Sequence, residues 1–340
     1  MTWQDQRLPR EHPAVHSGKI GVLLVNLGTP EAPEPGAVKR YLAEFLSDRR
    51  VVEIPALVWQ PILRGIVLAT RPKKSAHAYA QVWTAQGSPL AAVTRAQAEG
   101  LQARLGDDVT VAWAMRYGSP SIPDRLESLM AAGCERVLFA PLYPQYCSAT
   151  TGTAVDKAGD WLRTRRWQPA VRVLPPYHDD PLHIDALAAD LGAQLDALDF
   201  APEVLLLSFH GMPQRTLELG DPYHCHCRKT ARLLEEAMAR PDLRFATSFQ
   251  SRFGRAKWLE PATDRALAGE AAKGTRRLAI AAPGFSADCL ETREELAIRG
   301  KEQFHTAGGT HFATLDCLNT SAPGMAMLEA LVRRELSGWI

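Results

Sequence analysis

The chain has 340 residues, of which 46% are hydrophobic and 23% charged, and its 39 basic and 38 acidic side chains leave a formal net charge of +1. This length is enough for about two domains of ordinary size, and the composition is typical of a globular protein. The near-zero charge gives no chain-wide basic field, so we expect no nucleic-acid partner. Six cysteines are too few for a disulfide framework, and the first 18 residues lack the apolar stretch of a secretory signal. We therefore expect a cytoplasmic protein.

Short apolar runs alternate with longer stretches of helical periodicity along the chain, which predicts an α/β architecture with mainly parallel strands. The strands are expected to be buried on both faces, as in doubly wound sheets, because their apolar runs are continuous. The clearest helical stretches are residues 93–105, 122–132 and 230–239. The clearest strands are residues 20–27, 109–115, 136–141, 171–174, 204–209, 245–249 and 278–282.

Residues 54–69 form the most apolar window, but Pro55, Pro61 and Arg64 interrupt it. A helix that spans a membrane needs about 20 predominantly apolar residues, so this segment is too short. We expect an amphipathic helix or a lip at the mouth of a pocket. Peripheral contact with a membrane through this lip is a further reading.

A faint internal repeat divides the chain into two halves. LVNLGTP at residues 24–30 is similar to LSFHGMP at 207–213, and APLY at 140–143 is echoed by APGF at 282–285. We expect two similar domains, 18–177 and 178–320, with a helix at about 321–338 that packs back on the first. Ligands of open α/β sheets bind beyond the carboxyl ends of the strands, so a cleft between the halves is the expected binding site.

The loop after the first strand reads GTPE, which is neither a G-x-G-x-x-G motif nor a P-loop. The glycines that a nucleotide phosphate requires are therefore missing. This observation argues against a dehydrogenase and against a kinase.

Two kinds of side chain near the expected cleft are candidates for catalysis or metal binding. His210 ends a buried strand, where it is either a hydrogen-bonded structural histidine or a base or metal ligand. Glu291 and Glu295 are four residues apart and share one face of a helix. That face is either an ordinary solvated surface or a path for a cation, because carboxylate oxygens and imidazole both suit Fe²⁺.

Eight stretches of the sequence match the motifs of one known family, and they occur in the same order along the chain. The sequence resembles the ferrochelatase family along nearly its whole length, from Ile20 to about Trp339. The matching stretches are LLVNLGTP (23–30), YAQVWTAQGSP (79–89), MRYG (115–118), YPQY with TTG (143–152), SFHGMP (208–213), GDPY (220–223), FQSRFGRAKWLEPATD (249–264) and PGFSADCLET (283–292).

The resemblance implies two Rossmann-like domains, as in type II chelatases, that clasp a porphyrin in the cleft between them. It implies insertion of Fe²⁺, as substrate, into protoporphyrin IX to form protohaem, the last step of haem biosynthesis, with release of two protons. A neutral imidazole can accept such a proton. The implied catalytic and metal-contacting residues are His210 and Glu291, with Glu295 and Asp288 as an acidic track. The implied porphyrin contacts are Leu27, Arg116, Tyr117 and Trp258.

The chain departs from some relatives in three places. It has no cysteine-rich carboxyl tail, and Ser148 stands where cluster-bearing relatives have a further ligand, so we expect no iron–sulfur cluster. Cys225 and Cys227 lack a second pair at zinc-finger spacing and are expected to be bare surface thiols. Cys289 replaces a histidine that some relatives place near the glutamate.

Two other functions fit part of the pattern. One is a related chelatase that loads cobalt or nickel into another tetrapyrrole. The other is a non-catalytic haem or porphyrin carrier, which needs a pocket and an axial ligand but has no use for an acidic track. The motifs are most similar to those of the iron enzymes.

Overall fold

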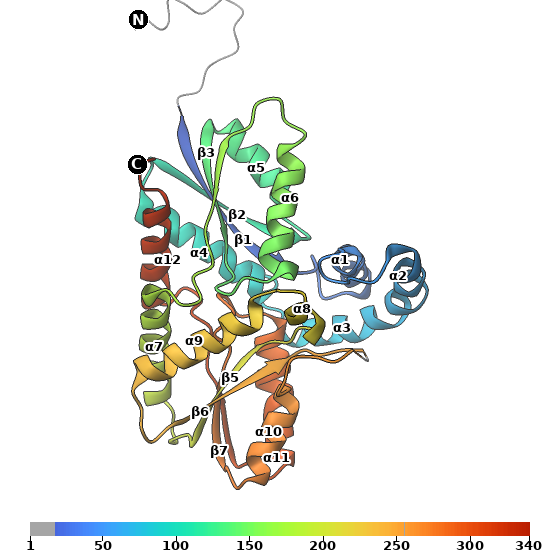
Figure 1. Cartoon of the computed structure of the whole chain (residues 1–340), viewed down its shortest axis with the longest axis vertical. Helices are drawn as coiled ribbons and strands as arrows, with labels where there is room; N and C mark the ends of the chain where they lie inside the picture. Colours follow the sequence, from blue (N-terminus) through green and yellow to red (C-terminus); the bar gives the residue numbers. More distant parts are fainter. Residues whose placement is uncertain (1–17, 255) are drawn as a thin grey trace, which may run out of the picture.

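The computed structural model describes residues 18–254 and 256–340, so the amino-terminal segment that we expect not to be a secretory signal lies outside the described residues. Two parallel four-stranded sheets stand one above the other in Figure 1, each flanked by helices. The first has the order β2-β1-β3-β4 and the second β6-β5-β7-β8. Their strands are β1 (Lys19–Gly28), β2 (Val109–Tyr117), β3 (Cys134–Pro141), β4 (Ala170–Val173), β5 (Val204–His210), β6 (Arg244–Gln250), β7 (Arg277–Ala281) and β8 (His311–Thr314).

The parallel α/β prediction is confirmed, and each of the seven expected strands is present. The central strands β1 and β5 are almost wholly buried, as their continuous apolar runs predict. The sequence analysis missed β8, because this edge strand has four residues, HFAT, and none of them is fully buried. An exposed edge strand lacks the apolar run by which the others are recognised.

Two of the three predicted helices begin earlier than periodicity alone indicates, and α5 begins at residue 122 as predicted. α4 starts at Pro89, because a proline suits the first turn of a helix, where its missing N–H needs no partner. α9 starts at Tyr223 and so includes Cys225 and Cys227. The helices are α1 (Pro35–Ser47), α2 (Ala56–Ile62), α3 (Leu68–Val82), α4 (Pro89–Leu105), α5 (Ile122–Ala131), α6 (Thr153–Leu162), α7 (Pro181–Asp196), α8 (Gln214–Glu218), α9 (Tyr223–Met238), α10 (Thr263–Ala272), α11 (Lys301–Thr306) and α12 (Ala322–Glu335), with π-helices η1 (Leu63–Val67), η2 (Ser148–Gly152) and η3 (Glu291–Gly300).

The repeated glycines have the same structural role in both halves. Gly28 ends β1, and a Cβ there would lie 2.0 Å from the carbonyl oxygen of Tyr117 on the neighbouring β2. Gly211 follows β5, and a Cβ there would lie 2.4 Å from the carbonyl oxygen of Gln250 on β6. Glycine is required at both positions because the backbones approach so closely. The repeated motif in the sequence therefore corresponds to the same close approach of two backbones at the end of the central strand in each half.

A shared apolar core joins the two halves. It combines residues of β1 and β3 with residues of β5 and β7, together with α7 and α12. In Figure 1, α12 runs beside α4 at the first sheet and α7 lies below it. Arg104 on α4 pairs with Glu329 on α12 at 3.1 Å. The two sheets therefore share one core and do not pack independently.

Residues 54–69 fold into α2, η1 and the first turn of α3, which project to one side of the molecule in Figure 1. Leu57 is 93% exposed and Ile66 61% exposed, so the segment presents apolar side chains to solvent. Leu63, in contrast, is buried against α1 and α3. Within residues 18–254 and 256–340, no helix has both the length and the apolar character needed to cross a bilayer.

Candidate active site

His210 and Glu291 lie at the same edge of the second sheet. His210 is the last residue of β5, and Glu291 starts η3 after the loop that follows β7. Strands β5 and β7 are parallel neighbours, so their carboxyl ends open to the same side. The topology thus places the expected base and the expected carboxylate at one end of the cleft-facing sheet.

The ring of His210 is held in one orientation by its own chain. Its Nδ1 lies 2.7 Å from the carbonyl oxygen of Gly211. A carbonyl oxygen only accepts hydrogen bonds, so Nδ1 must carry the hydrogen. In the neutral ring, Nε2 then has a free lone pair. Because the side chain is only partly buried, this lone pair is available to accept a proton or bind a metal.

Neutral polar groups from both halves surround Glu291. Tyr41 on α1 and Tyr79 on α3 are buried beside it, and helices α3 and η3 contact each other. Burial first, and then the charge of Glu291, raise the pKa of the Tyr79 phenol. The same two causes, in the same order, raise the pKa of the Cys289 thiol. Both groups therefore remain protonated at neutral pH, so Glu291 faces hydrogen-bond donors rather than other charges.

The other two members of the expected acidic track are engaged by the protein. Asp288 is buried and accepts hydrogen bonds from Thr292 at 2.7 Å, Arg293 at 2.7 Å and Asn319 at 2.6 Å. Glu295 also accepts two hydrogen bonds, both from Ser251. The acidic track of the sequence analysis stays a prediction, and the structure adds that two of its carboxylates accept hydrogen bonds from the protein whereas none is present to Glu291 among the hydrogen bonds of the described residues.

Glu291 and Glu295 belong to a π-helix of ten residues rather than to an α-helix. Such helices are rare and usually limited to a single turn, and they occur often at functional sites. The wider turn changes which side chains lie above one another, which the four-residue spacing alone did not predict.

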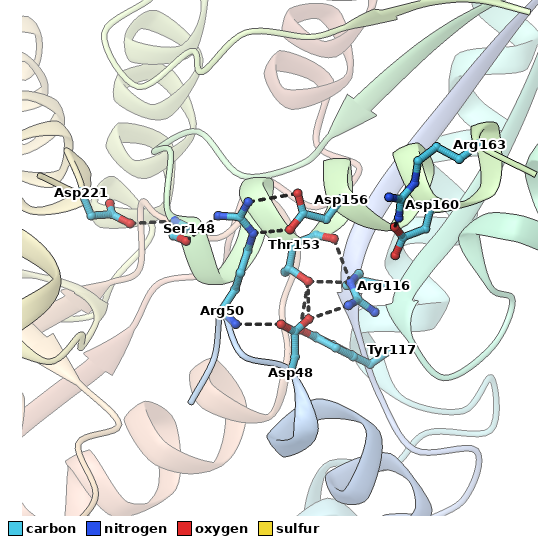
Figure 2. Close-up of polar contacts among 10 residues, drawn as sticks. All are labelled: Asp48, Arg50, Arg116, Tyr117, Ser148, Thr153, Asp156, Asp160, Arg163 and Asp221. Carbon is cyan, nitrogen blue, oxygen red and sulfur yellow. Dashed lines mark hydrogen bonds and ion pairs between the residues drawn. The ribbon is translucent and has the colours of Figure 1, made fainter. Parts of the chain in front are cut away.

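Arg116 and Tyr117 lie at the end of β2, in a network that the sequence analysis missed (Figure 2). The Tyr117 hydroxyl donates to Asp48 at 2.9 Å, and Arg116 Nε donates to Thr153 Oγ1 at 2.7 Å. Burial opposes ionisation of Asp48, but hydrogen bonds led by those from Thr153 and Arg50 outweigh it and lower the pKa. Asp48 therefore stays ionised and holds the Arg116 guanidinium against the protein.

The same network continues into the second half of the chain. In Figure 2, Arg50 lies between Asp156 and Ser148, and Asp221 reaches Ser148 from the other side. The Ser148 backbone N–H donates to Asp221 at 2.7 Å. No local sequence pattern indicated these contacts, because Asp48 and Thr153 alone are 105 positions apart.

The two apolar residues expected at the porphyrin come from different halves of the chain. Leu27 is the penultimate residue of β1, before Gly28, and packs against the apolar cluster that contains Tyr41 and Tyr79. Trp258 packs beside the glycine after His210, since a Cβ on Gly211 would lie 3.3 Å from its ring. Its indole N–H donates to the carbonyl oxygen of Phe253 at 3.0 Å. Leu27 and His210 thus hold equivalent places in the two halves.

Comparison with known proteins identifies the family. The family model described as ferrochelatase matches residues 19–336. The chain belongs to the ferrochelatase family. It is 54% identical over 334 residues to the ferrochelatase of Rhizobium meliloti (strain 1021), covering 97% of this chain and 98% of that one. It is 52% identical over 344 residues to the ferrochelatase of Agrobacterium fabrum (strain C58), covering 100% of both chains.

Solved structures support the fold. SirB from Bacillus subtilis with Fe³⁺ superposes with a TM-score of 0.57 at 12% identity, covering 94% of this chain and 97% of that chain. CbiX, the terminal enzyme of sirohaem biosynthesis in denitrifying bacteria, gives a TM-score of 0.50 at 14% identity, covering 94% and 100%. The expected chelatase-like fold and the resemblance to the ferrochelatases are both confirmed. Family membership makes the chain an iron-inserting lyase of haem synthesis and decides against a non-catalytic carrier.

Proposed function

We propose that the chain inserts Fe²⁺ into protoporphyrin IX to form protohaem, with His210 as the proton acceptor at the ring. The observation that carries this role is the hydrogen bond from Nδ1 to the Gly211 carbonyl, which makes Nδ1 the donor, so that in the neutral ring the Nε2 lone pair is the one left free. A free porphyrin has two pyrrole protons that must leave as the metal enters. An imidazole whose acceptor nitrogen faces the ring can take one of them without any rearrangement.

Glu291 is the proposed partner of His210 in handling the metal and the second proton. Carboxylate oxygens are hard ligands that suit Fe²⁺, and imidazole suits iron as well. In the part of the chain that the structure describes, no Lys, Arg or His side chain forms an ion pair with Glu291, whereas Asp288, Glu294 and Glu295 each pair with an arginine, so a charge on Glu291 is uncompensated. That uncompensated charge favours approach of a divalent ion. Asp288 and Glu295, whose oxygens are occupied, have no part in the proposed path of the ion.

The porphyrin is proposed to lie between Leu27 on one side and His210 with Trp258 on the other. The flat apolar macrocycle gains most of its affinity from burial against such apolar side chains. Tyr117 is wholly buried in the same apolar cluster as Leu27, so it and Arg116, which Asp48 and Thr153 hold, are proposed to support the Leu27 side from within rather than to touch the ring. A ring held at its edges can be bent by binding energy, which exposes its nitrogen lone pairs to the incoming ion.

We also propose that no iron–sulfur cluster is present. Cys225 is exposed and Cys227 is wholly buried on the same helix, so the two thiols point to different environments and are poorly placed to share one metal. The expectation that both were surface thiols is therefore wrong for Cys227, because α9 turns it into the core. Of the six cysteines, five are buried.

The cellular setting proposed is the cytoplasm, with protoporphyrin IX and ferrous iron as the partners and no nucleic acid. We further propose peripheral membrane contact through the lip of residues 54–69, supported by the exposed Leu57 and Ile66. The domain division at 177/178, with residues 321–338 packed back on the first domain, is retained as a proposal. The contact between α12 and α4 supports it, although α12 also packs on α7 of the second domain, where Arg334 pairs with Asp180 at 2.6 Å.

A spectrophotometric assay tests the function directly. Purified protein is given protoporphyrin IX with Fe²⁺, Co²⁺ or Zn²⁺ under reducing conditions, and loss of the free-porphyrin spectrum is followed. We expect turnover with Fe²⁺. Binding of porphyrin with no metal insertion would indicate a carrier, and preference for Co²⁺ would indicate a chelatase of another pathway.

A further inference from the structure

Ser251 and Glu295 form a paired contact between two separate parts of the second half. The backbone N–H of Ser251 donates to Glu295 Oε1 at 2.8 Å, and its hydroxyl donates to Oε2 at 2.6 Å. Both bonds are charge-assisted and therefore stronger than bonds between neutral groups. Ser251 has φ +64°, in the left-handed region that favours glycine. A serine is held there only when its surroundings determine the conformation, and the Glu295 carboxylate supplies that constraint.

Ser251 is the first residue after β6, and the segment that it begins leads to Trp258. The far end of this segment is bound to the residues just beyond β5. There the backbone N–H of Gln214 donates to the Lys257 carbonyl at 2.8 Å, and the Trp258 ring packs beside Gly211. The Glu295 carboxylate is thus the anchor of the near end, and the backbone of β5 and its extension is the anchor of the far end.

The middle of the segment reaches the first half of the molecule. The Arg71 guanidinium on α3 lies over the Phe253 ring, 5.2 Å from its centroid. The Phe253 carbonyl in turn accepts the indole N–H of Trp258. Through Phe253, the segment therefore connects α3 of the first half to the Trp258 indole, which lies beside Gly211 at the end of β5.

We infer that Glu295 is a positioning residue, which fixes Ser251 at the end of β6 and, through residues 251–254 and 256–258, helps to hold Trp258 in place for the porphyrin. This inference rests on the proposed function of the cleft. It assigns Glu295 a role different from that of an ion path, since both carboxylate oxygens are used by Ser251. Loss of the carboxylate releases a residue in an unfavourable backbone conformation, so the segment and its indole lose their defined position.

Measuring porphyrin binding in the absence of metal distinguishes a positioning role of Glu295 from a role in the path of the ion. The Kd for protoporphyrin IX is measured by porphyrin fluorescence in the full chain, and the KM for Fe²⁺ is measured separately. Glu295→Ala should weaken porphyrin binding about tenfold, the loss of roughly one charge-assisted hydrogen bond, and leave the KM for Fe²⁺ within about twofold. Ser251→Gly removes the hydroxyl without backbone strain and should weaken binding about threefold. Combined with Glu295→Ala, it should add nothing.

Glu302→Ala is the charge-matched control. Glu302 is an exposed residue of α11, the helix that follows η3, and its replacement by Ala removes the same negative charge. It should leave porphyrin binding unchanged. A raised KM for Fe²⁺ with unchanged porphyrin Kd in Glu295→Ala would overturn the inference in favour of an ion path. Fully additive effects of Ser251→Gly and Glu295→Ala would overturn it as well.

A second measurement does not depend on the proposed function. Trypsin cleavage after Arg252 and Lys257 in the native chain should be faster in Glu295→Ala than in the wild type or in Glu302→Ala, because the released segment is more often accessible. Unchanged cleavage would overturn the positioning role. A wild-type chain that inserts no iron would refute the proposed function but leave this proteolytic comparison intact, so the two failures are distinguishable.

Discussion

The Nδ1 atom of His210 lies 2.7 Å from the carbonyl oxygen of Gly211, the next residue in the chain. This contact fixes the tautomer of the imidazole before any substrate arrives, because the carbonyl can only accept. The glycine is itself required, since a Cβ at position 211 would collide with the Gln250 carbonyl oxygen. Two adjacent residues thus supply both the base and the constraint that orients it.

Replacement of His210 by Ala should abolish metal insertion while porphyrin binding survives, because most of the affinity comes from burial of the ring. We expect kcat to fall to less than about one tenth of the wild-type value, equivalent to more than about 1.4 kcal/mol. The insertion assay and a fluorescence titration without metal check the two halves of this prediction. A variant that keeps more activity than this would rule out His210 as the principal proton acceptor.

Replacement of Glu291 by Gln should depress turnover strongly while fold and porphyrin affinity stay near normal, because Gln keeps the shape and loses the charge. A raised KM for Fe²⁺ would mark a binding role, and a lowered kcat alone a role in the transition state. Glu294→Gln is the matched control, since Glu294 lies on the same π-helix and pairs with Arg299 at 2.9 Å. If Glu291→Gln leaves both constants unchanged, Glu291 belongs to a solvated helix face.

Replacement of Gly211 by Ala should destabilise the protein by about 1–3 kcal/mol, because the new methyl group would lie 2.4 Å from the Gln250 carbonyl oxygen and force the strand ends apart. Gly269→Ala in α10 is the control, because the space around it is open. An alanine in a helix interior should stabilise by about 0.5–1 kcal/mol relative to glycine. Urea unfolding midpoints of the two variants should therefore move in opposite directions, and a shift in the same direction would contradict the prediction.

The six cysteine thiols should react with a thiol reagent in two classes, one fast and one slow. Cys225 is exposed, whereas burial raises the pKa of the Cys227 thiol well above its ordinary range. A thiol reagent such as DTNB should therefore modify one cysteine quickly in the native protein and the other five only on unfolding. The Cys225→Ser variant should lose the fast phase. A fast phase of two or more thiols, or stoichiometric acid-labile sulfide in the purified protein, would contradict the proposed cysteine arrangement.

Stability should fall in acid through Glu270. Burial disfavours its charge, but hydrogen bonds led by that from Arg244 outweigh burial and lower the pKa to about 2. A lowered folded-state pKa contributes stability that is present above pH 4.5 and is lost as pH falls towards 2. We expect about 2 kcal/mol, discounted because the Arg244 and Lys273 side chains are largely exposed.

The variant Glu270→Gln isolates this contribution. It should be less stable than the wild type at pH 7, and the difference should shrink between pH 4.5 and pH 2. Denaturant unfolding at a series of pH values measures it. A difference that is independent of pH would show that Glu270 stabilises the fold by packing and neutral hydrogen bonds.

The sequence by itself determined seven of the eight strands of the described residues, the resemblance between the two halves, and the family. Continuous apolar runs identify buried strands because burial is a property of each residue type, and the repeated glycines report a local approach of two backbones. It also singled out His210 and Glu291, which the topology then brings to the same sheet edge. These features depend on short stretches of chain, which a sequence pattern can show.

Only the tertiary structure decided which polar groups pair. Glu295 is 44 positions from Ser251, and Asp48 is 105 positions from Thr153, so no local pattern could predict either contact. Hydropathy predicts how deeply a side chain is buried but not which partner it meets, because the partner comes from another element packed against it. The sequence could therefore place Asp288, Glu291 and Glu295 in one predicted acidic track, but it could not show that Asp288 and Glu295 accept hydrogen bonds from Asn319 and Ser251.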